Sequence, residues 1–467
     1  MIVETSFVFH DKLTEIVKVK RQEIKALLAQ YPSGKIPGVE EAELSLVAKL
    51  QSEGYPFFIT EFKRQSPSEG DINSVDNPLN QVELYLKGGC GAISVLADSQ
   101  FFGGSFDDVE SASLLAGAYG IPVLHKDFIL HPIQVYRGRQ AGASAFLMIP
   151  RILEIDEINA LNETAQELNM DILYEIHDLT DYEKIKHLNP KVIGVNNRDL
   201  ATFKVALNRS NVIANCLPVK HFLIAESGIA APIDLAVSSA FADGFLIGTA
   251  LMKGKLPLNF TKNIADNKFF FKACGLRTKE DLSSAKADLV GINFSPISKR
   301  RISIEVLDKA TLPENSVAVF RENSREEITE ILKKYPFKYV QLYSDEVDLD
   351  FLKMLSQKVI LGVLMSGKYN LEKALEFAAE TDFFILDGPV PGSGGEIKME
   401  IPADFPYPFM WAGGLNSTNL EICESHPMCF GVDIASGIEE KGEVSLVKIK
   451  EINQIINKLE RTSFHKE

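Results

Sequence analysis

The stretch "FITEFKRQSPSEG", residues 58–70, decides how the fold is to be interpreted. With Phe57 before it, its first part is an apolar run that fits a buried strand, but Glu61, Lys63 and Arg64 follow closely. A charged cluster at the end of a hydrophobic strand is either a solvated strand end or the floor of an active site. The pattern in the rest of the chain distinguishes between these two interpretations.

Similar apolar runs recur through the first half of the chain, and a longer amphipathic segment follows each of them. They are nearly continuous rather than alternating, as expected of parallel strands that are covered on both faces. Segments between them, such as "PLNQVELYLKGG" and "EINALNETAQELN", carry apolar residues at helical spacing. The eight runs lie at residues 56–62, 91–97, 121–126, 144–149, 171–176, 192–197, 221–227 and 242–248.

The second half repeats this count of eight, at residues 268–274, 287–294, 315–320, 338–343, 358–365, 382–387, 408–414 and 429–436. Two successive sets of eight strand–helix units predict an α/β chain with two consecutive (β/α)8 TIM barrels. A doubly wound sheet is the alternative for either half, but it usually has fewer strands and a glycine-rich first turn, and no G-x-G-x-x-G stands there.

The expected domain boundaries follow from the two sets of runs. They are a first barrel in residues 1–256, a linker in 257–267, a second barrel in 268–460 and a C-terminal tail in 461–467. The segment "LTEIVKVKRQEIKALLAQ" predicts an amphipathic helical extension before the first barrel, ended by the breaker "YPSGKIPG".

Charge and cysteine content narrow the class of protein. The net charge of -15 argues against a nucleic-acid binder, although it allows an anionic substrate in a locally basic pocket. The five cysteines are odd in number and lack paired metal-ligand spacing, which predicts neither a disulfide framework nor a zinc site. No secretory signal opens the chain and no apolar stretch approaches the ~20 residues of a membrane helix, so we expect a cytoplasmic protein.

The chemistry of a (β/α)8 barrel lies at the C-terminal ends of its strands. In the first half these ends carry charged or polar residues, which the barrel would gather at one mouth: Glu61, Lys63, Lys126, Glu175, Asn196, Arg198, Glu226 and Ser227. Glycines follow the last two strands in "ESGI" (226–229) and "IGTALM" (247–252), where phosphate commonly binds to accessible backbone N–H groups. The first half therefore predicts a phosphate-binding barrel enzyme.

Seven motifs of the first half resemble, in order, those of the indole-3-glycerol-phosphate synthase family. They are "EFKRQSPS", "DSQFFGGSF", "VLHKDFIL", "YEIHD", "IGVNNRDL", "AESGI" and "FLIGTALM". The resemblance implies that the first barrel cyclises 1-(2-carboxyphenylamino)-1-deoxyribulose 5-phosphate, with loss of carbon dioxide and water.

This resemblance also implies roles for single residues. Lys126 would protonate the alkoxide that forms when a ring carbon attacks the ketone, and Lys63 would pair with the substrate carboxylate and take part in proton transfer. Glu175 would deprotonate the intermediate or assist loss of the hydroxyl, while Glu61 would hold the lysines charged and oriented. The order in which the lysines act stays open. The other assigned residues are Asn196 and Arg198 for the hydroxyls and carboxylate, Ser66 in the substrate site, and Ser227, Gly228 and Gly248 near the phosphate.

Taken singly, these residues have plainer explanations. Glu61 and Lys63 fit a strand-end ion pair, Glu175 fits a satisfied buried acid, and Ser227 and Gly248 fit tight turns. Their common position at strand ends, in barrel order, favours the functional interpretation.

The second half carries a thiol and an acid at strand ends. Cys274 ends the first strand in "KACGLRTKEDL" (272–282), and Asp387 ends the sixth; alone, they would be an inert buried cysteine and a loop cap. The loops after strands seven and eight offer a phosphate site at Gly413, Gly414, Ser436 and Gly437.

These motifs resemble the phosphoribosylanthranilate isomerase family. The resemblance implies an Amadori rearrangement in which Asp387 protonates the furanose ring oxygen and Cys274 removes the proton from the adjacent carbon. Arg300, in "SKRRI", would bind the anthranilate carboxylate through its planar fork.

The second half also departs from that family. "VQLYSDE" has Tyr343 and Ser344 where the family usually has His and Gly. "GGEIKMEI" replaces the usual Phe-Asp-Trp, and "EEKGEV" replaces Gly-x-Lys-Asp. None of these changes removes the proposed acid or base.

The favoured hypothesis is a bifunctional tryptophan-biosynthesis enzyme, in which the second barrel makes the ketose phosphate that the first consumes. It needs no cofactor and no metal. Its expected partners are phosphorylated anthranilate–ribose substrates, without nucleic acid or membrane, and a monomer is expected.

In the alternative, only the first barrel is catalytic and the second is a stabilising or binding module. A histidine-pathway barrel is disfavoured, since it needs paired aspartates where the first barrel has Glu61 and Glu175.

Overall fold

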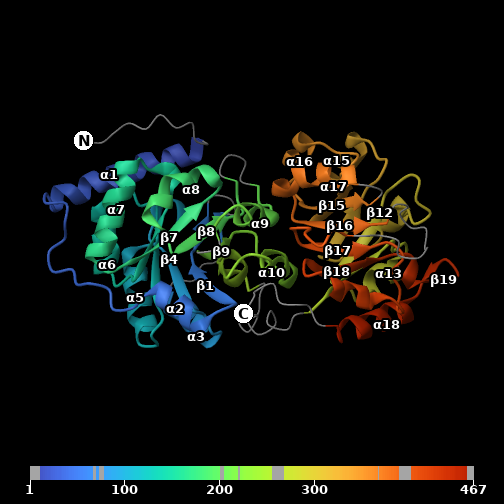
Figure 1. Ribbon diagram of the computed structural model, residues 1–467, viewed down its shortest axis with the longest axis horizontal. Helices are drawn as coiled ribbons and strands as arrows, with labels where there is room; N and C mark the ends of the chain where they lie inside the picture. The colour runs from blue at the N-terminus through green and yellow to red at the C-terminus, as the bar shows by residue number, and fades with distance from the viewer. Residues whose placement is uncertain are drawn as a thin grey trace. The chain divides into compact units, whose positions relative to one another are not determined.

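The computed structural model describes residues 11–66, 70–72, 78–199, 204–218, 221–254, 268–365, 368–388 and 401–459. Within them lie two closed barrels of eight parallel strands, each in its own compact unit (Figure 1). The prediction of two consecutive (β/α)8 barrels is confirmed. The expected linker and C-terminal tail lie outside the described residues, so the exact boundaries stay predictions.

The strands of the first barrel coincide with the eight apolar runs of the first half. They are β1 (Phe57–Phe62), β4 (Ala92–Leu96), β5 (Val123–Lys126), β6 (Ala145–Met148), β7 (Asp171–Ile176), β8 (Val192–Asn196), β9 (Phe222–Glu226) and β10 (Gly244–Ile247). Strand β1 pairs in parallel with β4 on one side and β10 on the other, which closes the sheet. All six residues of β1 are buried, as a strand covered on both faces requires.

Helices cover the outside of this barrel and begin where side chains cap them. Ser45 accepts a hydrogen bond from Ala48 N at the start of α2, and Asp178 accepts two at the start of α8. The helices are α1 (Asp11–Gln30), α2 (Leu46–Glu53), α3 (Pro78–Lys87), α4 (Ser99–Phe102), α5 (Phe106–Gly117), α6 (Pro132–Gln140), α7 (Ile155–Glu167), α8 (Leu179–Ile185), α9 (Asn208–Ala214), α10 (Pro232–Ser238) and α11 (Thr249–Met252). Shorter elements are η1 (Pro150–Ile152), η2 (Lys186–Leu188) and the antiparallel pair β2 (Gln65–Ser66) and β3 (Gly70–Asp71).

The second barrel follows the second set of apolar runs. Its strands are β11 (Phe270–Cys274), β12 (Leu289–Asn293), β13 (Ser316–Val319), β14 (Tyr339–Tyr343), β15 (Lys358–Leu364), β16 (Phe383–Asp387), β17 (Phe409–Ala412) and β18 (Cys429–Ile434). Strand β11 pairs with β12 and with β18, so this sheet is closed too.

Helices and short elements complete the second barrel around a core rich in phenylalanine. They are α13 (Lys279–Ser284), α14 (Ile304–Leu307), α15 (Arg325–Lys334), α16 (Leu349–Met354), α17 (Lys368–Glu376), η3 (Ala378–Glu380), η4 (Leu420–Ser425), η5 (Ser436–Ile438), β19 (Glu439–Glu440), β20 (Glu443–Val444) and α18 (Leu446–Ile456). Within the part of the chain that the structure describes, none of the helices combines the length and the apolar character needed to cross a bilayer.

The helical extension α1 is attached to the first barrel through a buried charge. Lys20 is 1% exposed, although it lies in the apolar stripe of the helix between Val17 and Ile24. Its Nζ lies 2.8 Å from Asp98 Oδ2 and 2.9 Å from Asp127 Oδ1. Burial would lower the pKa of Lys20, but these two carboxylates outweigh burial and raise it, so the ammonium stays charged. The extension is thereby tied to the ends of two barrel strands.

We expect Lys20→Met to lower the free energy of unfolding of the first barrel by about 3–5 kcal/mol, because it leaves two buried carboxylates without their cation. Urea unfolding followed by amide hydrogen exchange in β4 and β5 measures the change. Lys18→Met, at an exposed position of the same helix, is the matched control.

The single tryptophan, Trp411, provides an internal reference, since it lies in β17 and reports on the second barrel. Its fluorescence transition should be unchanged by Lys20→Met. An unfolding free energy of the first barrel equal to that of Lys18→Met would contradict the anchoring role of Lys20.

Candidate active sites

The mouth of the first barrel brings together charged side chains from four strand ends. Lys126 Nζ, at the end of β5, lies 3.2 Å from Glu175 Oε2 of β7 and 3.6 Å from Glu226 Oε2 of β9. At the end of β1, Lys63 Nζ lies 2.6 Å from Glu61 Oε1. These carboxylates are almost fully buried, and the two lysine side chains are only 14–15% exposed. The cluster is therefore a desolvated ionic network rather than a solvated rim.

Charge compensation sets the protonation of Lys126. Burial alone would lower the pKa of its ammonium, but Glu175, Glu226 and Glu61 together raise it above the ordinary lysine value. Lys126 is thus held as a charged hydrogen-bond donor at neutral pH. It can stabilise a developing negative charge and deliver a proton to it.

The two acids that flank Lys126 are driven to opposite protonation states. Burial would raise the pKa of Glu175, but Lys126, His177 and the hydrogen bond from Asn196 bring it down to about 2. The pKa of Glu226 is raised well above its ordinary value, first by burial and then by the charge of Glu175. The pKa values of the two acids are thus shifted in opposite directions, an arrangement typical of acid–base sites.

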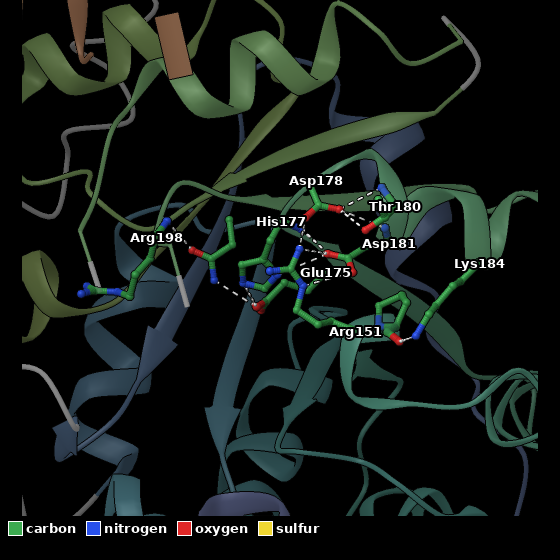
Figure 2. Close-up of polar contacts among 10 residues, drawn as sticks. Arg151, Glu175, His177, Asp178, Thr180, Asp181, Lys184 and Arg198 are labelled. Carbon is green, nitrogen blue, oxygen red and sulfur yellow. Dashed lines mark hydrogen bonds and ion pairs between the residues drawn. The ribbon is translucent and has the colours of Figure 1, made fainter. Parts of the chain in front are cut away.

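A chain of contacts supports Glu175 from behind. His177 Nε2 lies 3.4 Å from Glu175 Oε1, and the backbone N–H of His177 donates to Asp181 Oδ2 at 2.8 Å. Arg151 in turn pairs with both Asp181, at 3.0 Å, and Asp178. Figure 2 shows His177 between Glu175 and this acidic pair, with the guanidinium of Arg151 beside the pair. The position of Glu175 is thus fixed by His177, just after β7, and by residues of α8 and η1 behind it.

Asn196 joins this network, and the backbone of Arg198 supports it. Asn196 donates to Glu175 Oε1 at 3.0 Å and accepts from the backbone N–H of Arg198 at 3.0 Å. Figure 2 shows the side chain of Arg198 extending away from Glu175. The backbone of Arg198 therefore helps to hold Asn196, while its side chain points away from Glu175.

The glycine and serine positions of the first mouth differ in what they do. A Cβ on Gly248 would lie 2.4 Å from Glu61 Oε1 and 3.1 Å from Lys63 Nζ, so this glycine makes room for the ion pair. Ser227 and Gly228 have φ of 66° and 87°, so both adopt left-handed backbone after β9. Ser66 is buried in the short strand β2.

The mouth of the second barrel is built around a buried lysine. Lys272, two residues before Cys274 in β11, is fully buried, and its Nζ lies 2.9 Å from Asp433 Oδ1 of β18. Burial raises the pKa of the Cys274 thiol to about 11, although Lys272 opposes this shift. Burial and the nearby charge of Asp433 raise the pKa of Asp387 to about 7. The site thus contains a carboxylic acid that stays protonated well above its ordinary range.

The remaining assigned residues of the second barrel surround this acid and thiol. The guanidinium of Arg300 is paired with Glu439 through Nε at 2.8 Å and Nη2 at 2.9 Å. It packs over Gly275, where a Cβ would lie 2.6 Å from Arg300 Cδ. A Cβ on Gly413 would lie 2.9 Å from Asp387 Oδ1, which places this glycine against the acid. Gly414 has φ of 73° after β17, and Ser436 and Gly437 form η5 after β18.

Several residues of the two mouths received no role from the sequence. Glu226 and His177 lie inside motifs of the first half, but only the structure shows their contacts with the cluster. Lys272 and Asp433 were missed altogether. A signal was present for Lys272, because a lysine inside the apolar run "KFFFKAC" with the same parity as Cys274 points to the same face of the strand.

Comparison with known proteins matches both halves of the chain. The family model of indole-3-glycerol phosphate synthase matches residues 13–264, and that of N-(5'-phosphoribosyl)anthranilate isomerase matches residues 271–455. The tryptophan biosynthesis protein TrpCF of Vibrio parahaemolyticus is 32% identical and covers 92% of this chain and 93% of its own. The TrpCF protein of Helicobacter pylori is 30% identical over 96% of this chain and 98% of its own. The indole-3-glycerol phosphate synthase of Opitutus terrae is 37% identical over 53% of this chain and 96% of its own.

The low pKa of Glu175 predicts a pH dependence of stability. A carboxyl whose pKa falls to about 2 on folding stabilises the folded state above its ordinary pKa, and this contribution is lost as the pH falls toward about 2. We expect Glu175→Gln to lower the unfolding free energy of the first barrel by about 2–3 kcal/mol at pH 7, and by less at pH 3.5. Urea unfolding at both pH values measures this difference.

Glu226→Gln is the matched control, since burial raises the pKa of Glu226 and glutamine resembles the neutral acid. We expect it to change the unfolding free energy little at pH 7. A pH-independent loss in Glu175→Gln, or an equal loss in both variants, would contradict the opposite protonation of the two acids.

Proposed function

The chain belongs to the indole-3-glycerol phosphate synthase and phosphoribosylanthranilate isomerase families, as a bifunctional enzyme of tryptophan biosynthesis, and on this premise we propose which side chains carry each reaction. The second barrel isomerises N-(5-phosphoribosyl)anthranilate to 1-(2-carboxyphenylamino)-1-deoxyribulose 5-phosphate. The first barrel converts this ketose to indole-3-glycerol phosphate with loss of carbon dioxide and water. A purely structural second barrel is not favoured, because relatives with both functions match along nearly the whole chain.

In the first barrel, Lys126 is the proposed general acid. As the ring carbon of the anthranilate attacks the ketone, negative charge develops on the ketone oxygen, and a charged ammonium beside it lowers the barrier. The observation that carries this proposal is the position of Lys126 beside the ionised carboxylate of Glu175, 3.2 Å away, which keeps the ammonium charged. Lys63, held by Glu61, would pair with the substrate carboxylate until carbon dioxide leaves.

Glu175 is the proposed base of the first barrel. Its ionised carboxylate can take the ring proton that must leave when the indole becomes aromatic, and Asn196 and His177 hold it in place. The raised pKa of Glu226 supports a role as a second acid, which can donate a proton when the hydroxyl departs as water. Ser66 and Arg198 would bind the substrate, and Ser227, Gly228 and Gly248 would lie near its phosphate.

In the second barrel, Asp387 is the proposed acid and Cys274 the proposed base. Asp387 would protonate the furanose oxygen so that the ring opens to a Schiff base, and the thiolate of Cys274 would then remove the proton at the adjacent carbon. The raised pKa of Asp387 supports the first role, and the ammonium of Lys272 supports the thiolate. Arg300 would contribute to carboxylate binding, and Gly413, Gly414, Ser436 and Gly437 would bind the phosphate.

We also infer that the enzyme acts in the cytoplasm, as a monomer, on these phosphorylated substrates. The cytoplasmic location is supported by the cysteines, all five of which are unpaired. The monomeric state is supported by the closure of both sheets, because a closed barrel has no free edge strand to pair with another chain.

Separate assays of the two reactions test the assignment of acids and bases. We expect Lys126→Met to lower formation of indole-3-glycerol phosphate at least about 100-fold, measured by ultraviolet absorbance, because a general acid is lost. The isomerisation, followed by loss of anthranilate-type fluorescence, should be unchanged. Cys274→Ala should give the opposite pattern.

Cys216→Ala, at an exposed thiol, is the matched control for Cys274→Ala. Loss of both activities in either variant would argue against two independent sites. Isomerisation that persists in Cys274→Ala would remove Cys274 from the mechanism.

The rate of isomerisation should depend on pH in an unusual way, because the proposed acid has a lower pKa than the proposed base. It needs Asp387 protonated and Cys274 ionised, but their pKa values are about 7 and about 11, so at most about one molecule in 10⁴ has this form. Below pH of about 7 that form becomes tenfold commoner with each pH unit, and between about 7 and 11 its abundance is constant. We therefore expect kcat/KM to rise up to pH of about 7 and then to level off.

Asp433→Asn checks the cause of this bend, because the charge of Asp433 helps to raise the pKa of Asp387. The bend should move to lower pH in that variant. A profile that falls as the pH rises through 7 would show that the acid and base assigned here do not act together.

A further inference from the structure

An arginine and a tyrosine lie stacked at the mouth of the second barrel, and neither has a role in the reaction as described so far. Arg321 follows β13, and Tyr343 is the last residue of β14. The guanidinium carbon of Arg321 lies 4.7 Å from the centroid of the Tyr343 ring. Because a guanidinium is attracted to an aromatic face, this contact restrains the position of Arg321.

Tyr343 lies in the same mouth as the acid and the thiol. It is 6% exposed and pairs with Gly362 of β15, where a Cβ would lie 2.9 Å from Tyr343 Cε1. The ring therefore occupies space that any larger residue at Gly362 would take. Burial raises the pKa of the phenol well above its ordinary value, and the charges of Asp387 and Cys274 add to this effect. Tyr343 is thus a neutral phenol within electrostatic reach of both reacting groups.

The guanidinium of Arg321 has two carboxylates near it, but within the described residues one of its buried nitrogens has no hydrogen-bond acceptor. Its nearest carboxylates, Asp345 and Glu346, lie 3.7 Å away, which is beyond hydrogen-bond range. Its Nη1 is buried and has no hydrogen-bond partner among the residues that the structure describes. A buried guanidinium N–H without an acceptor is costly, and an anionic ligand would remove that cost.

Arg300 differs from Arg321 in this respect. Two of its guanidinium nitrogens already donate to Glu439, at 2.8 and 2.9 Å, so its fork is occupied by an internal carboxylate. Arg300 follows β12 and Arg321 follows β13, and these two strands are neighbours in the barrel. The guanidinium of Arg300, however, packs over Gly275 after β11, whereas that of Arg321 lies over Tyr343 of β14.

We propose that Arg321, oriented by Tyr343, binds the aromatic carboxylate of the isomerase substrate. This subsite rests on the function proposed for the second barrel and adds a specificity-determining residue to it. Tyr343, where the resembling family usually has histidine, is a positioning residue that supplies a larger face for the guanidinium. The ligand class is an aryl carboxylate that carries a phosphorylated pentose.

Two substrates that differ only in the carboxylate test the proposal: N-(5-phosphoribosyl)anthranilate and N-(5-phosphoribosyl)aniline. We expect Arg321→Gln to raise KM for the anthranilate compound about 10- to 100-fold, because one charge-assisted hydrogen-bonded pair is lost. The value of kcat should change little. Turnover of the aniline compound should be the same in wild type and variant. Tyr343→Phe should behave as wild type, and Tyr343→Leu should raise KM for the anthranilate compound alone.

The matched control is Arg325→Gln, which removes a half-exposed arginine of the same barrel. Synthase activity of the first barrel should be unchanged in every variant. If Arg321→Gln lowers turnover of both substrates equally, Arg321 acts on the structure and the proposed subsite is wrong. If KM for the anthranilate compound is unchanged, the carboxylate is held without Arg321 and the proposal fails.

A binding measurement separates this proposal from the proposed isomerase function. The probe is the reduced, unreactive product 1-(2-carboxyphenylamino)-1-deoxyribitol 5-phosphate, and quenching of Trp411 in β17 reports its binding to the second barrel. If the wild type binds the probe but has no isomerase turnover, the proposed catalysis is wrong, and the affinities of wild type and Arg321→Gln for the probe decide whether the subsite exists. Equal affinities of wild type and Arg321→Gln for the probe would overturn the subsite itself.

Discussion

The closure of two parallel sheets is the constraint on which the rest of the structure depends. In each barrel the first strand pairs with both the second and the last, so the C-terminal ends of all strands meet at one mouth. The strands are buried on both faces, and charged groups at their ends are therefore brought together with little water. Such groups must compensate one another or change their protonation. The chemistry of both sites follows from how each mouth meets this requirement.

The two mouths meet it in opposite ways. In the first, Lys126 lies between Glu175 and Glu226, so that the ammonium and Glu175 stay charged while the pKa of Glu226 is raised. In the second, the buried ammonium of Lys272 is paired with Asp433, and the pKa of Asp387 is raised so that this acid holds a proton instead. A cyclisation that must stabilise an alkoxide is thus served by a charged ammonium. A ring opening that needs a proton at neutral pH is served by a neutral carboxylic acid.

The strands and their ends could be predicted from the sequence because each depends on a local pattern. A continuous apolar run specifies a strand buried on both faces, and the residue that ends it is visible in the same stretch, as with Lys126 and Asp387. The contacts between strand ends could not be predicted in the same way. The pairing of Arg300 with Glu439, or of Lys272 with Asp433, depends on register and packing between residues that are more than a hundred positions apart. The raised pKa of Glu226 could not be predicted from the sequence either, because it follows from burial beside Glu175 rather than from residue type.

One feature that both barrels share connects these distant contacts back to the sequence. Functional side chains lie against glycines of neighbouring strands or loops, where an added Cβ would come within 3 Å of them. The pairs are Glu226 with Gly194, Glu61 with Gly248, Arg300 with Gly275, Tyr343 with Gly362, and Asp387 with Gly413. Real Cβ atoms almost never approach so closely, so even alanine at these glycines would force the functional group to move. A glycine at such a position therefore indicates that a side chain from another strand or loop lies against it. The sequence shows the glycine but does not identify the side chain that it accommodates.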